Sequence, residues 1–83
     1  MSSIYNILNL YERFFLGHVF RTKDIMLSYD VSEKTAKRYI SIIRNHLADE
    51  LVKGVVNPRV IVYDKRVGYY MKSYEKGGKI NGK

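Results

Sequence analysis

The sequence contains no cysteine and only 2 histidines among its 83 residues. The absence of cysteine excludes disulfide bonds and thiolate metal ligands, and 2 histidines are too few to form a zinc site alone. No apolar run approaches the roughly 20 residues that span a bilayer, because Asn9, Glu12 and Arg13 interrupt the first hydrophobic segment. The N-terminus also lacks the basic start of a signal peptide. We therefore expect a cytoplasmic protein that does not bind a membrane.

Acidic residues are also few, since 8 Asp and Glu stand against 15 Lys and Arg, which gives a net charge of +7. Such a balance attracts polyanions and makes nucleic acid the leading candidate partner. The sequence shows no Ser, His and acid constellation, no phosphate-binding glycine loop and no carboxylate pair. We therefore expect that the protein is not an enzyme and needs no cofactor.

The length of 83 residues allows one hydrophobic core and hence one domain, which we expect to cover residues 1–73. Residues 74–83 are rich in Gly and Lys, so we expect a flexible basic tail there. Within the domain, apolar residues at three- and four-residue spacing predict a helix over residues 3–16, closed by Gly17. A second, short helix is predicted from Thr22, as its N-cap, to Ser28 or Tyr29.

A third helix is predicted from the N-cap Ser32 to about Leu51, with Val31 and Ala36 as a hydrophobic staple. Its predicted buried stripe consists of Ala36, Ile40, Ile43 and Leu47. Its opposite face is polar and mostly cationic, with Lys34, Lys37, Arg38, Ser41, Arg44 and Asn45. The predicted helix is therefore amphipathic, with one apolar face and an opposite face that is mostly basic.

After Gly54 the chain becomes rich in β-branched and aromatic residues, beginning with Val55 and Val56. Two strands around residues 60–63 and 69–71 flank a polar turn at residues 64–68, which predicts a β-hairpin. Pro58 belongs to the irregular lead-in. The predicted fold class is α+β, with three helices followed by a hairpin.

This order of elements and two sequence segments resemble the winged helix-turn-helix domains of DeoR-type and BirA-like transcriptional regulators. Residues 31–43, VSEKTAKRYISII, are similar to the family's recognition segment Val-Ser-x-Arg-Thr-Ile-x-Arg-Asp-Ile-x-x-Leu. Residues 60–71, VIVYDKRVGYYM, resemble the family's ending, a hydrophobic strand followed by Gly-Tyr and an apolar residue. Lys34 stands where the family has Arg and Tyr39 where it has Asp, so the family's base preference is not carried over.

The resemblance implies sequence-specific binding to double-stranded DNA by a small prokaryotic, phage or mobile-element transcriptional regulator, acting as a repressor. Early residues of a recognition helix reach base edges in the major groove, which assigns Lys34 and Lys37 to base contacts. Arg38 and Arg44 suit phosphate oxygens, and Lys65 and Arg66 at the hairpin tip suit phosphate or the minor groove. The full predicted DNA-binding set is Ser32, Lys34, Thr35, Lys37, Arg38, Ser41, Arg44, Lys65 and Arg66.

Several of these residues have a purely structural alternative. Lysines are common on any solvated helix face, Ser32 is explained by capping alone, and Arg38 could instead pair with Glu33 or Asp30. Tyr39 flanks the buried stripe and could lie in the core, bond a phosphate, or do both.

The tyrosines of the hairpin and the two histidines are expected to have structural or surface roles. Tyr63, Tyr69 and Tyr70 could form a stacking platform for single-stranded nucleic acid, but strand alternation favours a packing role. His18 and His46 are expected to be structural or surface residues.

A different function class also fits the sequence. The same scaffold can serve as a protein-interaction module, such as a phage-encoded inhibitor or adaptor, because an acidic protein surface attracts the same basic face. RNA binding is a third reading. The apolar residues of the first helix that exceed the needs of the core also allow a homodimer, which would read two DNA half-sites.

Overall fold

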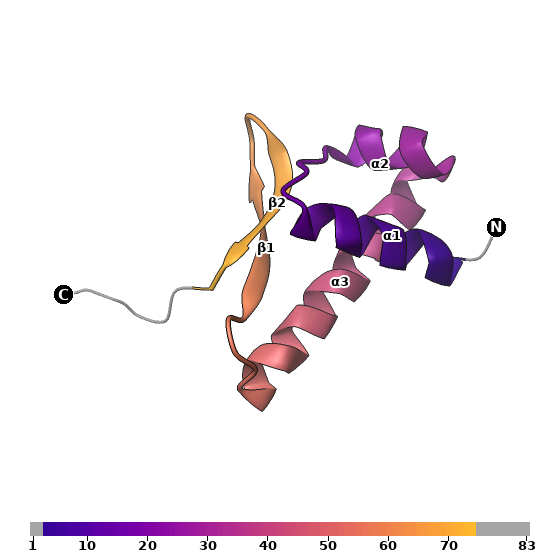
Figure 1. Cartoon of the computed structure of the whole chain (residues 1–83). Helices are drawn as coiled ribbons and strands as arrows, with labels where there is room; N and C mark the ends of the chain where they lie inside the picture. The colour runs from indigo at the N-terminus through magenta and orange to yellow at the C-terminus, as the bar shows by residue number, and fades with distance from the viewer. Residues whose placement is uncertain (1–2, 75–83) are drawn as a thin grey trace.

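The computed structural model describes residues 3–74 of the chain as three helices followed by a two-stranded antiparallel hairpin (Figure 1). The predicted α+β class and the order of elements are confirmed. The elements are α1 (Ser3–Phe15), α2 (Thr22–Tyr29), α3 (Glu33–Lys53), β1 (Arg59–Asp64) and β2 (Gly68–Ser73). In Figure 1, α1 crosses α3, and the hairpin stands beside the end of α1 that leads into α2.

The ends of α1 and α2 follow local capping chemistry. Gly17 has a φ of 92° and donates its N–H to the carbonyl of Phe14 at 3.0 Å, so the predicted closure of α1 is confirmed. The predicted N-cap of α2 is wrong by one residue, because Arg21 rather than Thr22 occupies that position. The carboxylate of Asp24 accepts the backbone N–H of Arg21 at 2.9 Å, and this bond starts the helix one residue earlier.

The predicted cap of α3 is confirmed, since the hydroxyl oxygen of Ser32 accepts the backbone N–H of Thr35 at 3.2 Å. The helix runs to Lys53, two residues past the predicted end at Leu51. Gly54 then takes a left-handed conformation, with a φ of 77°, and its N–H closes the last turn.

The core lies where α1, α2 and the hairpin meet α3. The predicted stripe of α3 is confirmed, since Ala36, Ile40, Ile43 and Leu47 are all buried. Leu10, Phe14, Phe20, Ile25, Tyr39 and Ile61 complete the buried cluster. Val31 is half-buried and packs on this cluster, in agreement with its predicted role before the helix.

Tyr39 belongs to the core, because only 2% of it is exposed. Its hydroxyl accepts a hydrogen bond from the side-chain amide of Asn6 at 3.0 Å. Of the two predicted roles of Tyr39, the structure therefore supports the one in the core. Nearby, the hydroxyl of Tyr29 donates to the side-chain oxygen of Asn9 at 2.6 Å and ties α2 to α1.

The hairpin pairs as the sequence indicates, with Val62 opposite Tyr70 and the turn between Asp64 and Gly68. Val55 and Val56 have strand-like composition but precede β1, because Asn57 takes a left-handed φ of 56° and breaks the extended run. Tyr74, the first residue of the predicted tail, donates its backbone N–H to Pro58 at 2.9 Å. Residues 75–83 of that tail lie outside the described residues.

The segment between α1 and α2 pairs with the hairpin through its backbone. Phe20 and Tyr69 form a two-bond antiparallel bridge, with N···O distances of 2.9 and 2.7 Å. Gly68, beside this bridge, has a φ of 108°, and a Cβ there would lie 2.6 Å from the carbonyl oxygen of Phe20. Glycine at 68 is therefore needed both for its backbone angle and for the close approach of another chain segment.

Replacing Ile43 with Ala should lower the free energy of unfolding by about 2 to 5 kcal/mol, because it removes volume from the centre of the core. The neighbouring Ile42, which is exposed, gives the matched control, and Ile42→Ala should cost less than about 1 kcal/mol. Urea unfolding of both variants measures the difference. An equal decrease in the free energy of unfolding for both variants would contradict the observed orientation of α3, with Ile43 buried and Ile42 exposed.

Replacing Gly68 with Ala should lower the free energy of unfolding by about 3 kcal/mol or more. The strain of an alanine at a positive φ adds to the steric overlap of its Cβ with the Phe20 carbonyl oxygen. Gly54 provides the control, because its φ of 77° is also positive but a Cβ there meets nothing within 4 Å. Gly54→Ala should therefore cost only about 1 kcal/mol. Thermal unfolding followed by circular dichroism compares them, and similar losses would argue against the close approach.

Candidate nucleic-acid interface

The basic residues of α3 form a row along its solvent-facing side. Lys34, Lys37, Ser41 and Arg44 follow a spacing of three, four and three residues, so they lie above one another over about 15 Å of helix. Arg38 and Asn45 flank this row. The exposed members of the predicted DNA-binding set are Ser32, Lys34, Lys37, Arg38, Ser41, Arg44, Lys65 and Arg66, and Thr35 is half-buried.

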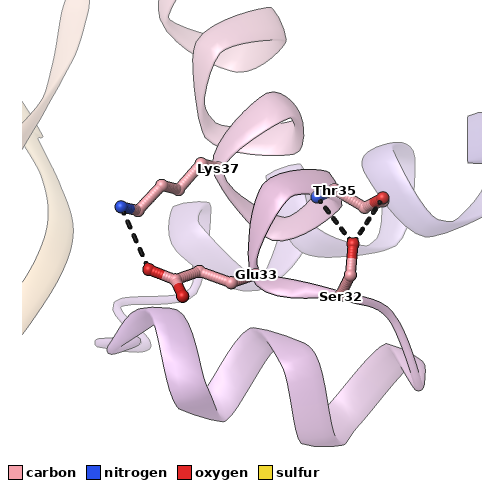
Figure 2. Close-up of polar contacts among 4 residues, drawn as sticks. All are labelled: Ser32, Glu33, Thr35 and Lys37. Atoms are coloured by element: carbon pink, nitrogen blue, oxygen red, sulfur yellow. Dashed lines mark hydrogen bonds and ion pairs between the residues drawn. The ribbon is translucent and has the colours of Figure 1, made fainter.

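The hydroxyl of Ser32 is occupied by the cap of α3 (Figure 2). It accepts the N–H of Thr35 at 3.2 Å and donates its hydrogen to the hydroxyl oxygen of Thr35 at 3.1 Å. Ser32 has only one hydroxyl hydrogen, so a bond to phosphate would require this contact to break. Thr35 is half-buried, and its hydroxyl is engaged in the same contact with Ser32.

Lys37 makes an ion pair with Glu33, one turn earlier on α3, with a distance of 3.1 Å from Nζ to the carboxylate (Figure 2). Both side chains are largely exposed, and exposed pairs of this spacing contribute about 0.3 to 0.5 kcal/mol. An approaching phosphate can therefore displace Glu33 easily. Within residues 3–74, Arg38 forms no ion pair, so the alternative pairing of Arg38 with Glu33 or Asp30 is not found.

Arg44 links α3 to the hairpin. Its guanidinium carbon lies 5.4 Å from the centre of the Tyr69 ring on β2. Tyr63, opposite Tyr69 on β1, contacts the same ring in a tilted arrangement with 4.9 Å between centroids, and 54% of Tyr63 is exposed. Tyr69 is half-buried and packs on the core, as predicted, whereas Tyr63 lies mostly in solvent.

The hairpin turn presents Lys65 and Arg66 to solvent. The side chain of Asp64 accepts the backbone N–H of Arg66 at 2.7 Å, which shapes the turn. The carbonyl of Arg66 in turn accepts a hydrogen bond from the guanidinium of Arg21. Sequence reasoning missed Arg21, because 45 residues separate it from Arg66 and no local pattern connects them.

An apolar groove of about 230 Å³ lies on a different side of α3, between it and α1. Its lining includes Leu8, of which 61% is exposed, together with Tyr11, Ile42 and His46. Burial raises the pKa of Tyr11, and the negative charge of Glu50 shifts it in the same direction. His46 lies at the surface, 3.1 Å from Glu50, as predicted for a surface histidine.

Residues 3–74 contain no cluster of three or more potential metal ligands, and no helix among them combines the length and apolarity needed to cross a membrane. No protein-family model, curated protein or solved structure matches the sequence. The functional interpretation therefore depends on the charge and geometry of α3 and the hairpin.

Replacing Ser32 with Ala should lower the free energy of unfolding by about 1 kcal/mol, because the first turn of α3 loses its cap. Ser41 is the matched control, since it lies on the same helix in an exposed interior position where Ala is the better helix former. Ser41→Ala should therefore leave stability unchanged or slightly raised in urea unfolding. An equal loss in both variants would show that the observed cap does not stabilise α3.

Proposed function

We propose that this protein is a winged helix-turn-helix regulator that binds double-stranded DNA sequence-specifically and represses transcription from a prokaryotic, phage or mobile-element promoter. The observation that carries the proposal is the exposed cationic row of α3 beside a hairpin whose turn carries Lys65 and Arg66. The buried stripe of α3 holds the other side of the helix in the core, so the cationic side faces outward. The order of three helices and a hairpin agrees with this type of domain.

In this proposal, the first turns of α3 enter the major groove, where every base pair presents a distinct pattern of hydrogen-bonding groups. Lys34 and Lys37 contact base edges, and Lys37 exchanges Glu33 for a DNA acceptor. Arg38 and Arg44 bind phosphates on the two sides of the row, while Lys65 and Arg66 contact phosphate or the minor groove. Occupation of a promoter then blocks RNA polymerase.

The groove between α1 and α3 supports a homodimer as part of the same proposal. It is lined by apolar and aromatic side chains and lies apart from the basic row, so a second copy could bind there without covering the DNA surface. A two-fold dimer would place two copies of α3 in successive major grooves, about one helical turn apart.

Substitutions on α3 and on the hairpin turn should affect DNA binding differently. Lys34→Ala or Lys37→Ala should weaken binding to the DNA sequence that the protein prefers by about 1 to 3 kcal/mol. The same variants should weaken binding to a random duplex by less, since only the preferred sequence offers the right base edges. Lys65→Ala and Arg66→Ala should weaken both similarly and lower the salt slope by about one unit each. Titrations of both duplexes at several salt concentrations measure these effects.

Lys53→Ala provides the charge-matched control. Lys53 pairs with Asp49 at the far end of α3, about 28 Å along the helix from Lys34. Its replacement should leave both affinities unchanged. If all four test variants bound DNA like the wild type while remaining folded, the basic face would be a surface for an acidic protein partner instead.

A further inference from the structure

Three arginines in the described part of the chain pair with aromatic rings and not with carboxylates. Arg13 lies over Phe20, Arg44 over Tyr69 and Arg59 over Phe15, at 5.0 to 5.4 Å from the ring centres. None of the ion pairs within residues 3–74 includes an arginine. Of these three arginines, only Arg44 belongs to the cationic row of α3.

The ring beneath Arg44 belongs to the residue that pairs with the segment between α1 and α2. Tyr69 exchanges two backbone hydrogen bonds with Phe20, and its side chain packs on the core. Tyr63 supports the ring from β1, at 4.9 Å between centroids. The position of the Tyr69 ring is thus determined by the backbone bridge, by the core and by a neighbouring aromatic ring.

A guanidinium over an aromatic face keeps the N–H groups at its edge available for other partners. Those donors match two phosphate oxygens in a bidentate contact. Lys37 differs, because its ammonium group is already paired with the carboxylate of Glu33. Arg44 has no ion pair with a carboxylate within residues 3–74, and its contact with the Tyr69 ring favours one arrangement of the side chain, which lowers the conformational entropy lost on binding.

We infer that Tyr69 is a positioning residue that holds Arg44 for a bidentate contact with a DNA phosphate, where the backbone passes between α3 and the hairpin. The inference rests on the proposed function and adds a residue for which sequence reasoning favoured a packing role. Tyr69 does not itself touch the phosphate. Its aromatic ring, and not its hydroxyl, is the part that acts on Arg44.

A double-mutant cycle with Arg44→Ala and Tyr69→Leu tests the inference on random duplex at several salt concentrations. Arg44→Ala should lower affinity about five- to tenfold and reduce the salt slope by about one unit, because one phosphate contact is lost. Tyr69→Leu should cause a similar loss in the wild type and almost none in the Arg44→Ala background. Independent, additive losses would overturn the positioning role.

Three further variants separate positioning from general structural damage. Tyr69→Phe keeps the ring and should bind like the wild type, so a loss as large as that of Tyr69→Leu would reject a role for the ring. Tyr70→Leu is the matched control, since Tyr70 is the next residue of β2 and is also half-buried, and it should not change affinity.

Arg44→Lys tests the guanidinium without altering the hairpin. This variant should bind DNA several-fold more weakly with an unchanged salt slope, because the positive charge remains but the planar guanidinium is lost. Wild-type affinity for Arg44→Lys would overturn the inference even if Tyr69→Leu failed to fold.

The same experiments distinguish this inference from the proposed function. A wild-type protein without salt-dependent duplex binding would reject both. A wild type that binds duplex while the cycle shows no coupling would reject only the role of Tyr69. If Tyr69→Leu weakened binding to a single-stranded oligonucleotide more than to duplex, the rings would act as a base-stacking platform and the inference would be wrong.

Discussion

The backbone bridge between Phe20 and Tyr69 determines how the hairpin is placed against the helices. Two hydrogen bonds join a residue of the segment between α1 and α2 to the second residue of β2. The bridge requires the close approach that only Gly68 permits, and it keeps Phe20 inside the core. A two-stranded hairpin alone is marginally stable, so this connection also supplies part of its stability.

The contacts between the candidate interface and the rest of the molecule depend on that placement. Arg44 reaches the ring of Tyr69 because β2 lies beside α3, and Arg21, which follows Phe20 directly, reaches the carbonyl of Arg66 at the turn. These two contacts join the cationic row and the hairpin turn to one rigid framework. In the proposed function, a single placement of the protein on DNA can therefore present both surfaces together.

Five carboxylates of the described residues have internal roles that do not involve an arginine side chain. Asp24 and Asp64 accept backbone N–H groups, while Glu33, Asp49 and Glu50 pair with lysine or histidine one turn away. Among the arginines, Arg13, Arg44 and Arg59 lie over aromatic rings and Arg21 reaches a backbone oxygen. Within residues 3–74, the side chains of Arg38 and Arg66 make neither contact. Because none of the ion pairs within residues 3–74 includes an arginine, the guanidinium groups remain available to an anionic partner.

Local chemistry was sufficient to predict most of the secondary structure. The spacing of apolar residues along α3 predicted its buried stripe, and Ser32 and Gly17 predicted two helix ends, because caps and periodicity depend on residues within one or two turns. The same periodicity identified the exposed cationic residues. The error at Thr22 arose because Asp24 caps the backbone from inside the helix, which competes with a hydroxyl cap at almost the same position.

The sequence by itself thus determined the helices, the hairpin turn and which side of α3 faces solvent. Only the tertiary structure decided that Tyr39 is buried against Asn6, that Phe20 pairs with Tyr69, and that Arg44 and Arg21 reach the hairpin. Each of these contacts joins residues that lie more than twenty positions apart in the chain. Helical and strand periodicity carry information over a few residues, whereas such pairings depend on how whole elements pack, and packing is set by the shape of the complete core.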